Sequence, residues 1–225
     1  MSEGSCCGVV VWFSDVDKQA GLADLCTKHK GILYLVAGAH PDNVDRTNKR
    51  LQDNWLANIE ELALRPECLG LLSGLNLTRN IATHFAQESL LRSTLALCDK
   101  RKLPLVLHVA GDGPSLDKAL EIMHDEGWAA ASPTPGALPV IDGRRSVMLY
   151  DALAACGGSP ARVGVAARAG LVCAVSGAGI SEEAGSAERD AARACVRAIP
   201  LTQLVTCSDS PWKTPQNLPD PYFRG

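Results

Sequence analysis

Short apolar runs alternate with helical patterns along this chain, and this alternation restricts its fold more than any other feature. The runs are apolar throughout, which is typical of strands that are buried on both faces of a parallel sheet. Helices between such strands supply the crossovers that parallel pairing requires. The sequence therefore predicts an α/β protein, built either as a closed barrel or as a doubly wound open sheet.

The predicted elements follow one another from end to end of the chain. The expected strands are residues 8–13, 32–37, 68–72, 103–108, 146–150, 171–175 and 204–207. The expected helices are residues 17–30, 47–64, 84–100, 115–126, 160–169 and 182–198. A segment rich in Ala, Pro and Gly, residues 129–145, is expected to be a loose insertion. We expect residues 1–212 to form one α/β barrel domain and residues 213–225 to form an extended, Pro-rich tail.

Composition limits the classes of partner. With a net charge of −3, the chain has no general basic field, so nucleic-acid binding would need a local patch or a metal. No apolar run approaches the ~20 residues of a spanning helix, and no secretory signal is recognised, so no membrane partner is expected. The nine cysteines are scattered, without a Cys-x-x-Cys pair. They are interpreted as buried free thiols of an intracellular protein, cytoplasmic or nuclear.

Five motifs occur in a defined order. They are Gly38-Ala39-His40-Pro41, Gly74-Leu75-Asn76, Gln87-Glu88 followed by the strand 103–108 that ends in His108, Ile199-Pro200, and Ser208-Asp209-Ser210-Pro211. In this order and at this spacing, the motifs resemble those of the TatD family of metal-dependent deoxyribonucleases. The resemblance extends over almost the whole chain, from about Gly8 to Pro215.

The resemblance implies an eight-stranded TIM barrel of the amidohydrolase type that hydrolyses phosphodiester bonds in DNA. Members bind one or two divalent metals, and an active site here would use Mg²⁺ or Zn²⁺. Such metals lower the pKa of a bound water and neutralise the phosphate. The family takes its ligands from a His-x-His pair on strand one, a Glu on strand four, His residues on strands five and six, and an Asp on strand eight.

Only part of this ligand set is carried over to the present sequence. His108 and Asp209 match the strand-five His and the strand-eight Asp. Leu72 falls at the Glu position, and Leu149 falls at or near the strand-six His, where Asp151 is the nearest substitute. The first expected strand matches the family's second, so the His-x-His strand is missing. Two sure ligands remain, whereas a catalytic zinc usually has three from the protein.

Each candidate also has a structural interpretation. His108 is either a metal ligand or a hydrogen-bonded imidazole at a strand end, and His40 either contacts a phosphate or only forms a His-Pro turn. Asp209 is a ligand, a catalytic base or a turn residue before Ser-Pro. Cys207 stands where the family often has Glu, and it is expected to be a buried thiol rather than a nucleophile.

The missing first strand and last helix would leave the barrel incomplete, with edges at Val9–Phe13 and Leu204–Cys207. A partner chain could cover such an edge by adding a strand. We therefore interpret the chain as a catalytically inactive scaffold or interaction subunit of a larger assembly, without a cofactor. The alternative is an active metal-dependent deoxyribonuclease or phosphoesterase that uses Asp209 catalytically and binds nucleic acid. A third hypothesis is a metal-free binder of small molecules in the barrel mouth.

Overall fold

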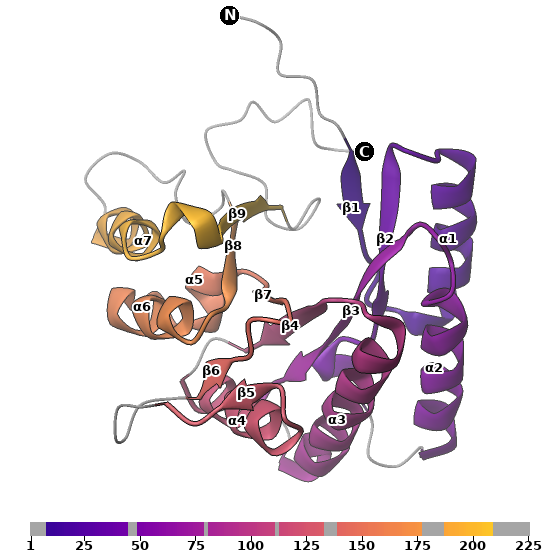
Figure 1. Cartoon of the computed structure of the whole chain (residues 1–225), viewed down its shortest axis with the longest axis horizontal. Coiled ribbons are helices and arrows are strands. Elements are labelled where there is room, and N and C mark those ends of the chain that lie inside the picture. Colours follow the sequence, from indigo (N-terminus) through magenta and orange to yellow (C-terminus); the bar gives the residue numbers. More distant parts are fainter. Residues whose placement is uncertain are drawn as a thin grey trace, which may run out of the picture. The chain divides into compact units, whose positions relative to one another are not determined.

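A computed structural model describes residues 8–44, 49–78, 81–110, 113–132, 139–176 and 187–208, without the side chains of residues 49–52 and 188. The chain divides into two compact units. Unit 1 contains Met1–Gly74 and Arg79–Val106, and unit 2 contains Leu75–Thr78 and Leu107–Gly225. Figure 1 shows the helices and strands of both units.

The main sheet has seven strands in the described part of the chain, in the order β1-β2-β3-β4-β7-β8-β9. Their bounds are β1 Val9–Val11, β2 Leu33–Gly38, β3 Cys68–Leu75, β4 Leu105–Val109, β7 Val147–Leu149, β8 Val172–Ser176 and β9 Leu204–Cys207. The pairs β1–β2, β2–β3, β7–β8 and β8–β9 are parallel. The prediction of a parallel α/β sheet is confirmed, and every expected strand is found.

Unit 1 consists of β1 to β3, the start of β4, and three α-helices. These helices are α1 Gln19–Lys28, α2 Lys49–Leu62 and α3 His84–Arg101, with short 3-10 turns at Val16–Lys18, Pro41–Asn43 and Ile81–Thr83. The register of β2 and β3 pairs Leu35 with Cys68 and Val36 with Gly70, so Leu69 is an extra residue. Because side chains alternate along a strand, this irregularity places Leu72 on the same face as its partner Gly38.

A buried glutamine holds the carboxyl ends of β1 and β2 together. Gln19 Nε2 donates to the carbonyls of Phe13 at 2.6 Å and Gly38 at 2.5 Å, and its Oε1 accepts from Gly38 N at 3.0 Å. The carboxamide therefore provides hydrogen-bond partners for the Phe13 and Gly38 carbonyls and for the Gly38 N–H, which the pairing of β1 with β2 leaves without a strand partner. This contact fixes the chain where β1 leaves the sheet.

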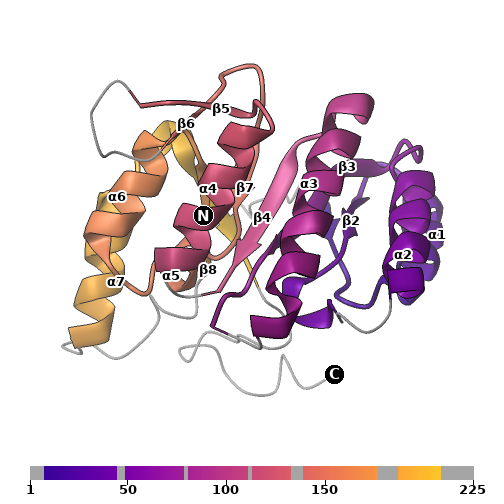
Figure 2. The ribbon, with the colours of Figure 1, turned by 90° about the horizontal axis from the view of Figure 1, so that it is seen from below.

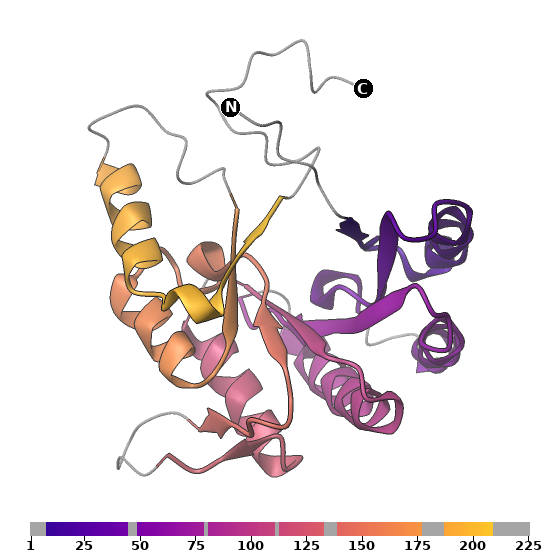
Figure 3. The ribbon, with the colours of Figure 1, turned by 45° about the horizontal axis from the view of Figure 1, so that its top comes forward.

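Unit 2 consists of the end of β4, the strands β7 to β9, and four α-helices. These helices are α4 Gly113–Asp125, α5 Ala152–Ala155, α6 Pro160–Arg168 and α7 Ala187–Arg197, and a 3-10 turn covers Leu201–Gln203. Figure 2 shows α6 and α7 side by side, and Figure 3 shows β9 next to β8. The first turn of α6 has Pro160 at its start, and Ser159 Oγ accepts from Arg162 N at 3.4 Å.

The expectation of a loose insertion at residues 129–145 is wrong for the residues described there. β5 (Ala129–Ala130) pairs antiparallel with β6 (Val140–Ile141). Trp128 is buried, and the Arg145 guanidinium lies 4.9 Å from its ring centroid. A cation over an indole face is an attractive contact. The contact between Arg145 and Trp128 could not be predicted from the composition of the segment, because it forms only in the folded chain.

Both ends of the strand order expose apolar side chains. Within the described residues, β1 pairs only with β2, and β9 pairs only with β8. Val9 and Val10 of β1 are 44% and 55% exposed although they point to opposite faces. The described sheet has seven strands, one fewer than a closed barrel of eight, as expected for an incomplete barrel. The expected tail at residues 213–225 lies outside the described part of the chain.

Substitution of Gly38 tests the close contact between β2 and β3. A Cβ atom at this position would lie 2.0 Å from the carbonyl oxygen of Leu72, so Gly38→Ala must displace backbone. We expect the free energy of unfolding to fall by about 2 to 3 kcal/mol. The control is Gly21→Ala in helix α1, where nothing lies within 4 Å of the added methyl. That variant should gain about 0.5 to 1 kcal/mol, and equal effects in urea unfolding would contradict the assignment.

Candidate active site

Polar side chains in unit 2 gather at the carboxyl ends of the strands. Asn76 follows β3, His108 lies in the last part of β4, Asp151 follows β7, and Ser176 ends β8. The carboxyl ends of parallel strands share one edge, where α/β barrels place their active sites. Sequence reasoning identified His108 and Asp151 at this edge, and the structure adds the hydroxyl groups of Ser176 and Tyr150.

Tyr150 connects three strands at this edge. Its ring is stacked on the imidazole of His108, with centroids 5.6 Å apart. Its backbone N donates to Leu107 O at 2.9 Å, and its Oη donates to Ser208 O at 3.3 Å. Tyr150 therefore connects the strand that carries His108 with the residue directly before Asp209. Asp209 itself lies outside the described residues.

Asp151 is a buried carboxylate on a left-handed backbone. It is 6% exposed, with φ 45° and ψ 60°, and its side chain makes no capping bond to helix α5. Ser176 Oγ donates to Asp151 Oδ1 at 3.4 Å, a long hydrogen bond. A left-handed non-glycine residue costs free energy, and such strain is often found at functional sites. The side chain is thus turned toward the end of β8.

Two leucines are buried at or near positions where the family resemblance led us to expect ligands. Leu72 in β3 is 1% exposed, and Leu149 at the end of β7 is fully buried. An alkyl side chain has no lone pair with which to bind a cation. Near the end of β7, the acidic side chain in the described part of the chain is that of Asp151, which accepts a hydrogen bond from Ser176 Oγ.

His40 belongs to unit 1 and shapes a turn. Its Nδ1 accepts from Asp42 N at 3.1 Å, which caps the 3-10 turn Pro41–Asn43. Its ring is stacked on Trp12, with centroids 5.9 Å apart and an interplanar angle of 4°. An accepting Nδ1 places the proton of the neutral ring on Nε2. These contacts account for the His-Pro turn, and the phosphate contact stays a prediction.

The described donor set does not fit a catalytic divalent ion. Among the residues that the structure describes, no group of three His, Cys, Asp or Glu side chains could hold a metal. His108 and Asp151 are the candidates in unit 2, and a catalytic zinc usually takes three protein ligands and a water.

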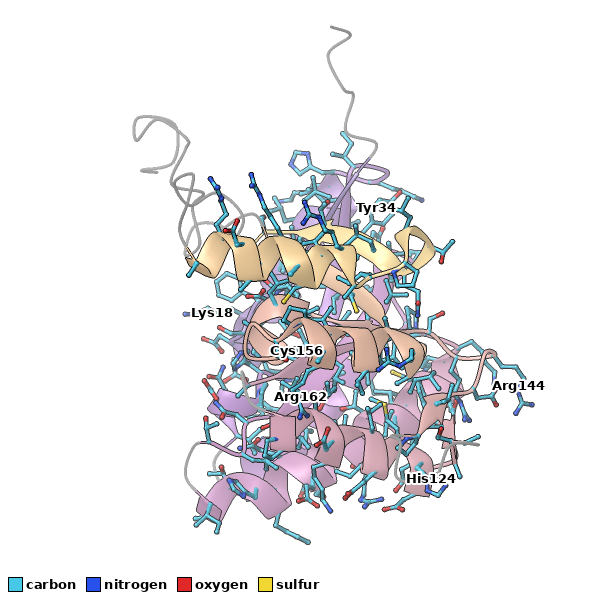
Figure 4. The ribbon with its side chains drawn as sticks, turned by 90° about the vertical axis from the view of Figure 1, so that its left-hand side faces the viewer. Lys18, Tyr34, His124, Arg144, Cys156 and Arg162 are labelled. Carbon is cyan, nitrogen blue, oxygen red and sulfur yellow. The ribbon has the colours of Figure 1, made fainter. Side chains whose placement is uncertain are left out.

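The buried cysteines in the described part of the chain are poor nucleophiles. Six described thiols are buried, and Cys207 is half-buried. Burial raises the pKa of Cys98 and of Cys156 to about 12 and the pKa of Cys173 to about 11. Figure 4 shows Cys156 and Arg162 on the helical side of unit 2. The thiolate is the reactive form, so these groups are inert near neutral pH.

Sequence reasoning did not identify Tyr150, Ser176 or Trp12 as parts of these clusters. The available signal was position, because Ser176 comes directly after the expected strand 171–175 and Tyr150 ends the expected strand 146–150. A polar residue at the end of a buried parallel strand faces the edge where sites form. The ring pairs Trp12–His40 and Tyr150–His108 could not be predicted from the spacing of the residues in the sequence.

The sheet, its crossover helices and the polar carboxyl edge define an α/β protein of the TIM-barrel type. The family model described as TatD related DNase matches residues 2–222, and the chain belongs to this family. A comparison with curated proteins gives no match. No helix in the described residues is long and apolar enough to cross a membrane.

Solved structures with the same type of fold are distant in sequence. One is a protein whose organophosphate hydrolysis activity was engineered from a weak promiscuous lactonase template, with TM-score 0.55 and 13% identity over 89% of this chain and 62% of that chain. A mutant organophosphorus hydrolase from Deinococcus radiodurans has TM-score 0.55 and 15% identity over 89% and 61% of the two chains. A PTE-like lactonase mutant from the same organism has TM-score 0.51 and 12% identity over 81% and 56%. The present chain thus spans about three fifths of their length, and the likeness shows the fold alone.

Native-state alkylation tests the assignment of the thiols. Because burial raises their pKa, Cys98, Cys156 and Cys173 should react far more slowly with N-ethylmaleimide than the half-buried Cys207. Mass spectrometry of peptides from the labelled protein would give the four rates. Labelling in guanidinium chloride is the control, and there the four rates should converge. Native labelling of Cys98 as fast as Cys207 would contradict the burial.

Proposed function

We propose that this TatD-family chain is a catalytically inactive scaffold or interaction subunit of a larger assembly. The observation that carries the proposal is the burial of Leu72 and Leu149, which lie at or near positions where the family resemblance places ligands. It is supported by the described residues, which offer no group of three metal-binding side chains. A catalytic zinc usually takes three protein ligands, and the described part of this edge offers His108 and Asp151.

The β1 edge supports an interaction role. Val9, Val10, Phe13 and Ile32 are all large apolar residues that are exposed at or beside this edge in unit 1. In the described residues, only one side of the β1 backbone is paired, with β2. Exposed edges of this kind are templates for an added strand. A protein partner that supplies a strand would bury these side chains and pair the remaining backbone groups.

The second candidate function is a metal-dependent deoxyribonuclease or phosphoesterase. The contact that favours it is the Tyr150 bridge, which joins His108 to Ser208, the residue before Asp209. His108, Asp209 and Asp151 would then hold the ion, with Asp209 also in the catalytic role. Mg²⁺ often keeps several waters and uses substrate phosphates, so it tolerates fewer protein ligands than zinc.

Metal analysis and a nuclease assay separate the two candidates. We expect the purified chain to hold far less than one equivalent of Mg²⁺, Mn²⁺ or Zn²⁺ by elemental analysis. We also expect no cleavage of single- or double-stranded DNA above background with any of these ions. Asp209→Ala should behave like the parent, as should Asp53→Ala on the exposed side of α2. Metal-dependent cleavage that is lost in Asp209→Ala but kept in Asp53→Ala would establish the enzyme and remove the scaffold proposal.

A lysine on β1 tests the edge. The chain alone should self-associate through its exposed edge, and Val10→Lys should shift it toward smaller species in light scattering. Because Val10 is 55% exposed, the free energy of unfolding should change by no more than about 0.5 kcal/mol. Ile81→Lys is the matched control, since Ile81 is 80% exposed but lies in a 3-10 turn. An equal shift in both variants would mean that general hydrophobicity, not the β1 edge, drives association.

A further inference from the structure

The open side of β1 presents a main-chain donor and a main-chain acceptor at one residue. Val9 N donates to Ile32 O at 2.7 Å, so Val9 and Val11 direct their N–H and C=O groups toward β2. Val10 lies between them and therefore directs its own N–H and C=O away from β2. Within the part of the chain that the structure describes, no strand pairs with that side (Figure 1). A partner at this edge must therefore match the two groups of Val10.

The side chains around this edge are apolar. Val10 points to one face of the sheet, and Val9 and Val11 point to the other. Phe13 and Ile32 are exposed beside the strand and extend the apolar surface. Sheet edges are usually protected from further pairing by lysine, by proline or by an inward-pointing charge. Residues 8–13 contain none of these, so the sequence does not oppose the addition of a strand.

An antiparallel copy of β1 matches this edge by symmetry. In an antiparallel pair, two directly opposed residues can exchange two hydrogen bonds, with their Cα atoms about 5.5 Å apart. With a twofold axis between two copies of Val10, each N–H meets the C=O of the other copy, so one contact satisfies both groups. The same register places Val9 opposite Val11 of the second copy. Cross-strand pairs of β-branched residues pack well on a sheet.

The charge of the edge favours this occupant over a partner of different chemistry. A symmetric contact brings the same surface of both copies together, so a charged edge would repel itself. Residues 8–13 carry no charge, and this penalty is absent. A charged partner segment would find no opposite charge on β1. The β9 edge is less suitable for pairing with β1 of another copy, because Thr206 is exposed there and Pro200 and Pro211 flank the strand in the sequence.

We propose that β1 pairs antiparallel with β1 of a second copy of this chain, forming a symmetric dimer whose axis passes beside Val10. The proposal rests on the interaction role proposed above and names the partner at that same edge. In the dimer the two sheets continue into each other across the axis. The exposed valines of both copies are then covered, and the main-chain groups of Val10 are paired.

Analytical ultracentrifugation of the full chain tests the dimer. We expect a monomer–dimer equilibrium that does not proceed beyond the dimer. Val10→Pro removes the outward N–H but no hydrogen bond to β2, and proline is tolerated where the N–H side of an edge strand is open. This variant should weaken dimerisation by at least about tenfold. Val10→Thr is the matched control, since it keeps the N–H and the β-branched shape, and it should dimerise nearly as tightly as the parent.

A disulfide across the axis tests the register and gives a second measurement if Val10→Pro does not fold. Val10→Cys should form a covalent dimer on treatment with diamide, because Cα atoms about 5.5 Å apart lie within the range that a disulfide spans. The parent, in which Cys207 is half-buried, gives the background. Val205→Cys on β9, where Val205 is also exposed, should not exceed that background.

A monomeric parent, a dimer that Val10→Pro leaves intact, or equal crosslinking of Val10→Cys and Val205→Cys would overturn the proposal. Growth beyond the dimer would overturn it in favour of head-to-tail contacts between copies. A monomer that cleaves no DNA would remove the dimer and leave the scaffold role in place. A dimer with metal-dependent cleavage that is lost in Asp209→Ala would remove the scaffold role and keep the dimer, so the two failures are distinguishable.

Discussion

Parallel strand pairing is the constraint on which the rest of this structure depends. Every strand must be followed by a crossover, and all carboxyl ends then come to the same edge of the sheet. The side chains at these carboxyl ends therefore determine what kind of site the sheet can form. In unit 2 these ends carry His108, Asp151 and Ser176, and the buried Leu149 ends β7.

Buried leucines at or near expected ligand positions affect the stability of the fold. A cluster of carboxylates and imidazoles is destabilising when no cation balances it, because like charges repel in a poorly solvated site. A fully buried leucine instead contributes roughly 1.5 to 3 kcal/mol by removing apolar surface from water. The burial of Leu72 and Leu149 therefore contributes to the stability of the fold through apolar packing. Packing of this kind supports the proposed scaffold role.

Much of the fold could be predicted from the sequence, because buried parallel strands are apolar throughout and their helices are amphipathic. The strand at residues 204–207 was predicted with the bounds that the structure gives it. Long-range contacts could not be predicted. The burial of Trp128 under Arg145 and the bridge from Tyr150 to Ser208 join residues that sequence patterns treat separately. The left-handed backbone of Asp151 likewise depends on its surroundings, since no local signal such as glycine marks it.

The Gln19 carboxamide has a consequence for recognition at the β1 edge. Because it fastens Phe13 and Gly38 by three hydrogen bonds, a strand of only three residues keeps its direction although one side of its backbone has no neighbouring strand in the described chain. An incoming polypeptide would then pair with a strand edge that is already extended and fixed. Its own ordering would be the main entropic cost of docking, since the host strand loses little freedom in the process.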